Sequence, residues 1–274
     1  MLEVLQYQFF QNALLIAVLA SLAAGIIGTY IVVKRMSLIA GSIAHAAFGG
    51  LGISYYLGLN PLMGAVVFSL LASSSVAVFR KRSRNRLDTL LSALWATGMA
   101  IGLVFMFLTP GYATDLFSYL FGNILLVSTV DLAMIVVLDV VIILAVALMY
   151  NPFLAVAFDE EYAEVRNLPV LVVDLILYGV IALTVVTIIR VVGIVLMIAL
   201  LTMPAAVGQL FHKTVKGIMV TASLITLFAT VSGLLTAYLI NFAPGPIIVL
   251  IISVIYIVSI GLGQLRNRRR SKHA

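Results

Sequence analysis

His45 is the residue of this chain whose type and position could best bind a metal ion. It lies about nine residues in from the polar boundary of the apolar stretch 38–57, or roughly 14 Å along a helix. An ionisable side chain in such a place is rare and usually faces a cavity or a partner. Neutral imidazole is the commonest protein ligand for divalent transition metals. His45 is therefore either a ligand or gate in a permeation path, or a neutral histidine that hydrogen-bonds a neighbouring helix.

Small residues surround His45 at helical spacing. Two rows recur at steps of four, namely Ser37, Gly41, His45 and Gly49, and beside them Ser42, Ala46, Gly50 and Ser54. Rows of small side chains let helices approach closely. We expect Gly41 and Gly49 to shape a close helix contact along a pathway.

Nine apolar stretches must position this histidine. They are residues 10–33, 38–57, 61–79, 90–109, 131–150, 170–189, 191–211, 217–240 and 246–264. Each is about the 20 residues that a helix needs to cross the hydrocarbon core of a bilayer. Of all residues, 64% are hydrophobic and 9% charged, which excludes a soluble globular domain. We predict an all-α polytopic bundle of about nine transmembrane helices, forming a single domain over residues 1–274.

The positive charges predict the orientation of the bundle. Fifteen of the 16 Lys and Arg residues lie in alternate connections between the apolar stretches, at positions 34–35, 80–86, 166, 213–216 and 266–272. Connections rich in Lys and Arg are cytoplasmic. The N-terminus is thus expected outside and the basic tail, residues 265–274, inside. Arg190 is the exception, on the outer side.

Composition also limits what the chain can do alone. Its net charge of +6 fits loops that face anionic lipid rather than a nucleic-acid partner, and it has no cysteine. No connection exceeds about twenty residues, which is too short for a catalytic domain. A GxxxxGK[ST] phosphate loop is absent from the sequence. Any energy must therefore come from another chain or an ion gradient, and the architecture suggests a prokaryotic inner membrane.

Residues 151–169 form the most informative connection, which by parity is cytoplasmic. Asp159 suits the N-cap of a short helix, Glu160 and Glu161 suit its first turn, and Pro169 ends it. Steps of three and four predict one apolar stripe, made by Phe158, Tyr162, Val165 and Leu168. The helix either lies against the membrane or its own bundle, or docks in a groove of a cytosolic partner.

Two further features could shape a pathway. Pro204 removes an internal hydrogen bond and should kink the stretch 191–211, with Thr202 able to satisfy a freed carbonyl. Residues 109–129 are apolar enough to fold back as a short helix at the outer mouth. Asp131, at the outer boundary, is expected to be solvated by water.

Several segments, taken in order, resemble the membrane subunits of ABC-type importers for zinc, manganese or iron(II). They are SLIAGSIAHAAFGG, RLDTLLSALWATGMAIGL, FDEEYAEVRNLPV and VVGIVLMIALLTMPAAVGQL, and the resemblance covers nearly all of residues 10–262. It implies a homodimeric permease that moves a divalent metal, with no catalytic residue and no covalently bound cofactor. It further implies an extracytoplasmic binding protein, and a cytosolic ATPase dimer that holds the ATP and docks on Phe158, Asp159, Glu161, Tyr162, Val165 and Leu168.

The sequence departs from that family at one important position. The family pattern usually has Asp four residues before the histidine, where this chain has Gly41. His45 is then the metal ligand that carries over. A replacement carboxylate could come from Asp139, inside the fifth stretch, or from Asp174, near the inner end of the sixth, and Asp139 is the better candidate by depth.

Two alternatives stay open. The chain could be a secondary metal transporter in which His45 and Asp139 exchange protons, although we find no internal repeat of the kind such carriers show. It could instead be an ABC permease for a siderophore-like or cobalamin-like chelate, since Gly41 removes a ligand and leaves space.

Overall fold

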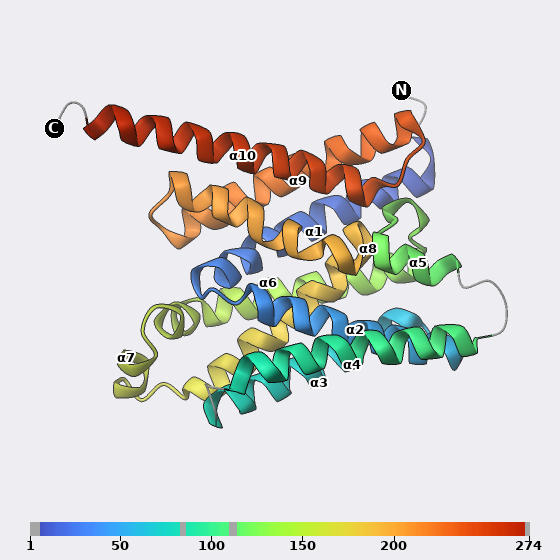
Figure 1. The fold of residues 1–274 in the computed structure, drawn as a ribbon, viewed down its shortest axis with the longest axis horizontal. Helices are drawn as coiled ribbons and strands as arrows, with labels where there is room; N and C mark the ends of the chain where they lie inside the picture. The colour runs from blue at the N-terminus through green and yellow to red at the C-terminus, as the bar shows by residue number, and fades with distance from the viewer. Residues whose placement is uncertain (1–5, 83–85, 110–113, 272–274) are drawn as a thin grey trace.

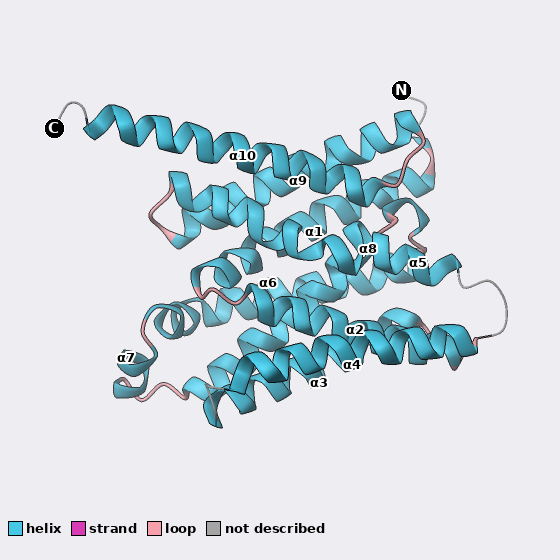
Figure 2. Ribbon diagram, in the orientation of Figure 1, coloured by secondary structure: helices cyan, strands magenta, loops and turns pink. Residues whose placement is uncertain are grey.

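The described part of the chain is helical throughout. The structure, a computed structural model, describes residues 6–82, 86–109 and 114–271, with the backbone alone for 114–117 and 264–271. These residues form helices and connecting turns without a strand (Figure 2). The prediction of an all-α bundle is confirmed.

Eight of the described helices are long and apolar enough to cross a membrane. They are α1 (Gln8–Val33), α2 (Ser37–Tyr56), α3 (Pro61–Arg82), α4 (Leu87–Leu108), α6 (Thr129–Phe158), α8 (Val170–Phe211), α9 (Val215–Ile240) and α10 (Pro244–Ser271). The short elements are α5 (Thr114–Phe121), the 3-10 helix η3 (Ile124–Leu126) and α7 (Glu160–Val165). The long helices run side by side, and α1 begins at the end of the bundle opposite to the one where α10 ends (Figure 1).

Basic residues of several connections gather at one end of the bundle. Lys34, which follows α1, and Arg80, in the last turn of α3, both contact Glu160 of α7. We call this the basic end, and the other, where α1 and α6 begin, the opposite end. The positive-inside rule predicts that the basic end is cytoplasmic.

The helix α8 contains two of the predicted stretches. Asp174, near its start, contacts Lys34 at the end of α1, and Leu201, in its second half, packs against Gly28 in the same part of α1. The chain therefore reverses within α8, as Figure 1 shows. The reversal lies at Gly193, whose φ of 78° and ψ of 169° are non-helical. With this reversal the helices match the nine predicted stretches; the number of crossings and the orientation stay predictions.

The helix α6 differs from its prediction. It extends through Phe158 rather than ending near residue 150, with non-helical dihedral angles at Met149 and with Pro152 inside it. A proline lacks the amide hydrogen that an uninterrupted helix needs, which explains a bend one turn before it. The first half of the predicted connection 151–169 is therefore helical.

The small residues of α2 pack that helix against two neighbours. Gly50 lies against Gly64 of α3, and a Cβ added at Gly49 would lie 3.1 Å from the carbonyl oxygen of Gly98 on α4. The glycines of these rows make close helix contacts, as small residues allow. This packing buries α2 and His45 inside the bundle.

Replacing Gly193 tests the reversal in α8. Its dihedral angles belong to a region that is essentially restricted to glycine, and an added Cβ would also collide with backbone atoms of Leu120 and Gly122. We expect Gly193→Ala to lower the free energy of unfolding by about 1–3 kcal/mol or more. Thermal unfolding in detergent measures this. Gly261→Ala is the matched control, since nothing lies within 4 Å of a Cβ there, and equal melting temperatures for the two variants would contradict the account.

Candidate functional site

His45 lies on the interface between α2 and α4. Its side chain is 7% exposed, and its ring stacks on Trp95 of α4 with ring centroids 3.9 Å apart and an angle of 22° between the planes. The Nδ1 atom has no hydrogen-bond partner among the described residues. This nitrogen forms no hydrogen bond to a neighbouring helix among the described residues, and the choice between a ligand and a structural histidine stays a prediction. The ring is held by stacking, with one nitrogen lone pair or N–H unused.

The space beside Gly41 is filled. A Cβ added at Gly41 would lie 2.8 Å from Cζ3 of Trp95 and 2.8 Å from Cδ1 of Ile198 on α8. A Cβ practically never comes so close to another heavy atom, so even an alanine would require a shift. The expected room for a chelate at Gly41 does not exist in this structure, because Trp95 occupies it.

Asp139 lies elsewhere in the bundle. It is 1% exposed, and its carboxylate lies near the Thr187 side chain of α8 without a well-formed hydrogen bond. Its helix α6 packs on α8 and α1, whereas α2 packs mainly on α4, α3 and α8. The described residues contain no group of three or more His, Cys, Asp or Glu residues that could hold a metal ion. A shared site for His45 and Asp139 thus stays a prediction.

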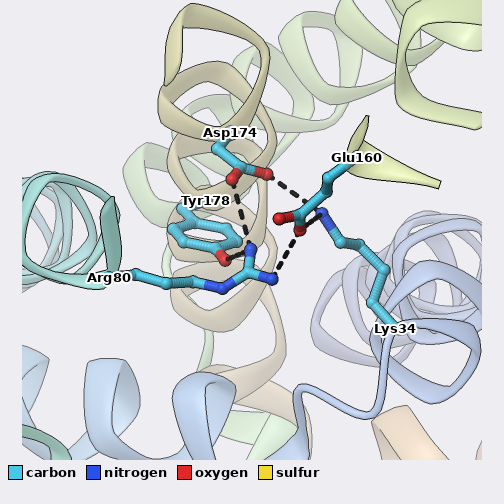
Figure 3. A network of polar contacts seen from close by, with 5 residues as sticks. All are labelled: Lys34, Arg80, Glu160, Asp174 and Tyr178. Atoms are coloured by element: carbon cyan, nitrogen blue, oxygen red, sulfur yellow. Dashed lines mark hydrogen bonds and ion pairs between the residues drawn. The ribbon is translucent and has the colours of Figure 1, made fainter. Parts of the chain in front are cut away.

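The second predicted carboxylate, Asp174, belongs to a charge network at the basic end (Figure 3). Lys34 Nζ donates to Asp174 Oδ1 at 3.0 Å, and Arg80 Nη1 donates to Asp174 Oδ2 at 3.2 Å and to the Tyr178 hydroxyl at 2.7 Å. Arg80 Nη2 also donates to Glu160 Oε1 at 2.5 Å, and Lys34 Nζ lies 3.6 Å from that atom. Asp174 is therefore committed to two cations.

We call Lys34, Arg80, Glu160 and Asp174 the charge ring, because each cation contacts both carboxylates. Glu160 was predicted only in the first turn of a short helix, and its partners were not predicted. The sequence did show that these four charges lie near the ends of apolar stretches, on the side of the membrane that the alternating basic connections predict to be cytoplasmic. Nothing in their spacing identified the pairs.

The helix α7 has the predicted beginning and a well-formed end. The Asp159 side chain accepts a hydrogen bond from the Tyr162 amide at 2.9 Å, so the N-cap prediction is confirmed. At the other end Asn167 has a φ of 57°, and the Leu168 amide donates to the Ala163 carbonyl at 3.0 Å, as in a Schellman motif. These caps hold six helical residues in place without a long helix.

The apolar stripe predicted for this segment divides between two directions. Phe158 is 69% exposed, Val165 is 81% exposed, and Tyr162 is also exposed. Leu168 is partly buried and packs against the core, and its place in the docking contact stays a prediction. We call Phe158, Tyr162 and Val165 the docking face. Arg166 lies beside this face and donates a hydrogen bond to the Tyr162 hydroxyl at 3.3 Å, and the three side chains are otherwise exposed.

At the opposite end, Asp131 is buried rather than solvated. It is 4% exposed and forms an ion pair with Arg190, the exceptional basic residue of the outer side. The guanidinium of Arg190 lies over the Tyr119 ring at 4.2 Å. A pocket of about 380 Å³ borders the pair and is lined in part by Tyr55 and Ser128. The expectation for Asp131 was wrong because the fold-back of the preceding segment encloses it.

The fold-back itself has two parts. Helix α5 and η3 follow each other between residues 114 and 126, and α5 packs on α8. Gly122 lies against Val192 and Gly193, at the reversal. The predicted short helix over 109–129 is thus present in the described residues, beside the reversal of α8.

Pro204 does not mark the break in α8. The residue of that helix with non-helical dihedral angles is Gly193, and the Thr202 hydroxyl donates to the Ile198 carbonyl at 2.7 Å. The carbonyl that Pro204 frees is that of Leu200, four residues before it, so Thr202 does not satisfy it. A pathway role for Pro204 stays a prediction.

Known proteins resemble this chain over nearly its whole length. The model of a family described as ABC 3 transport family matches residues 6–263. The chain is 44% identical to the uncharacterized membrane protein slr2045 of Synechocystis, over 95% of this chain and 92% of that protein. It is 33% identical to the manganese import system permease protein ScaB of Streptococcus parasanguinis, over 98% and 95%. The solved structure of PsaBC from Streptococcus pneumoniae in complex with Fab matches with a TM-score of 0.85 and 32% identity, over 94% and 93%.

The contact between Gly41 and Trp95 makes a prediction about stability. We expect Gly41→Asp to destabilise the protein by about 1–3 kcal/mol through overpacking alone, and to cost less when Trp95→Ala has removed the ring. Thermal unfolding of the wild type, both single variants and the double variant gives this coupling. Equal costs of Gly41→Asp with and without the tryptophan would show that Trp95 does not fill this space.

Proposed function

This chain belongs to the ABC 3 transport family, and we propose that it is the permease subunit of an ATP-driven importer of a divalent transition metal. It is a multi-pass protein of the prokaryotic inner membrane type, as its helices and bacterial relatives indicate. Its relatives are transport components rather than enzymes. The proposal goes further on the ATPase, the path and the cargo.

The docking face is the observation that carries the proposal. Tyr162 and Val165 project from the short capped helix α7, and Phe158 projects beside them from the end of α6. All three lie at the basic end, where water rather than lipid is expected. Exposed apolar residues on a helix are typical of a surface that enters a groove on a partner. The acidic first turn of α7 disfavours the alternative of a helix lying on anionic lipid. We infer that each permease binds one cytosolic ABC ATPase here, with Asp159 holding the helix and Glu161 at its exposed rim.

The path for the cargo passes His45. Its imidazole is buried near the middle of α2, and its Nδ1 atom has no described partner. A neutral imidazole is a suitable transient ligand for a metal that must enter and leave. Asp139, buried near Thr187 and without a described ion-pair partner, would act at a separate point of the bundle. The binding protein would deliver the metal at the opposite end, and a second copy of this chain would complete a homodimer.

Two arguments bear on the metal and lead in different directions. The relative ScaB is named as a manganese permease, and the resemblance extends over α2. A site with an imidazole and without a neighbouring carboxylate suits zinc better than manganese, which prefers oxygen ligands. The cargo is therefore proposed as a divalent transition metal, with manganese, zinc and iron(II) as the members to compare.

The two alternatives are less well supported. A proton-coupled carrier needs no ATPase. Membership of an ABC family and the exposed docking face both favour a chain that binds one. A bulky chelate would need space beside Gly41, and Trp95 and Ile198 fill that space.

Binding of the ATPase tests the docking face. Replacing Tyr162 and Val165 together by Asp puts two charges into the proposed contact, and we expect affinity for the cognate ABC ATPase to fall about a hundredfold or more. Copurification from detergent, followed by titration of the ATPase, measures the loss. Glu164→Gln, on the same helix, is the control and should bind as the wild type does. Undiminished binding by the double variant would remove the docking assignment.

A further inference from the structure

Glu160 joins the docking helix to membrane helices on which that helix does not pack closely. The described packing of α7 is on α6 and α8. The Glu160 carboxylate extends this to α3, through Arg80 at 2.5 Å, and to the end of α1, through Lys34 at 3.6 Å. One side chain of α7 thus connects the docking face to α1 and α3.

The charge ring makes these connections interdependent. Lys34 is shared between Glu160 and Asp174, and so is Arg80. The Lys34 side chain is 3% exposed, so its charge depends on these two carboxylates rather than on water. If Glu160 moved away, both cations would be left to Asp174 on α8. A displacement of α7 therefore changes the balance of forces on α1, α3 and α8 together.

The surroundings of the charge ring leave room for it to rearrange. A pocket of about 230 Å³ borders Arg80, Glu160 and Asp174, and another of about 380 Å³ borders Lys34, Arg80 and Glu160. Closely packed interiors resist such movement, whereas side chains beside open volume can exchange partners. The side chains of the charge ring can therefore exchange ion-pair partners without unpacking the core.

Helix α8 connects the charge ring to the opposite end of the bundle. Helix α8 runs without a non-helical residue from Asp174 to Arg190, which is about 24 Å at 1.5 Å per residue. Arg190 is paired with Asp131 at the opposite end. A displacement of Asp174 would therefore also displace Arg190, which borders the pocket at the opposite end.

We propose that the Glu160 carboxylate transmits movement of the docking helix α7 to the membrane helices, through the two cations that it shares with Asp174. Glu160 is a positioning residue in this role and does not touch the cargo. The inference rests on the proposed function, since the movement would originate in the docked ATPase. It names the residue through which ATP hydrolysis and opening of the pathway are coupled.

The variant Glu160→Gln tests this, because it removes the charge and keeps the size. In proteoliposomes that contain permease, ATPase and binding protein, we expect Glu160→Gln to retain the ATPase, while the metal transported per ATP hydrolysed falls about tenfold, a common size for coupling between sites. Glu164→Gln removes the same charge from the same helix and should transport as the wild type does. A wild-type ratio in Glu160→Gln would overturn the proposal, and so would loss of ATPase binding, which would make Glu160 part of the docking contact.

A second measurement does not depend on the cargo. The chain has no cysteine, so Glu164→Cys on α7, at an exposed position, and Val78→Cys on α3 can carry two spin labels. With the ATPase docked, addition of nucleotide should leave the distance between the labels unchanged in the wild type, since α7 and α3 move together, and should change or broaden it in Glu160→Gln. Identical responses in both would overturn the inference. A wild-type permease that binds no ATPase would overturn the proposed function instead.

Discussion

Charges that are buried at the ends of the bundle need partners, and two such pairings organise this protein. At the basic end, Lys34, Arg80, Glu160 and Asp174 neutralise one another across four helices. At the opposite end, Arg190 pairs with Asp131. Removing one member of a buried pair costs about 3–5 kcal/mol, so these contacts constrain which helix ends can lie together. Between them the bundle is held by small residues in close contact.

Much of the fold could be predicted from the sequence, because the membrane imposes a simple rule. Runs of about twenty apolar residues must be helices, and the predicted stretches match the helices, with the turn at Gly193 separating two of them. The cap at Asp159 was equally local. What could not be predicted depends on contacts between distant segments. The burial of Asp131 required the fold-back over it, and the inward direction of Leu168 required the shape of the α7 end. The stacking of Trp95 on His45 required the register of α4 against α2.

The same separation of local and distant information applies to the candidate site. His45 was recognisable as the histidine at membrane depth. Its surroundings were not, since a tryptophan about fifty residues later occupies the space beside Gly41. The candidate functional features therefore lie at different depths of the bundle. They are the docking face and the charge ring at the basic end, the His45 imidazole in the middle, and a polar pocket at the opposite end. This arrangement suits a permease in which energy enters at one end and cargo at the other.

The most direct test is uptake into proteoliposomes that contain this chain with its ATPase and binding protein. Manganese, zinc, iron(II) and cobalt would be offered in turn, with and without ATP, to the wild type and to His45→Ala. The account predicts ATP-dependent accumulation of one or two of these metals by the wild type and its collapse in the variant. Metal accumulation without ATP would contradict this prediction. So would a complex that hydrolyses ATP but accumulates none of the four metals. ATP-driven uptake that survives His45→Ala would remove His45 from the path.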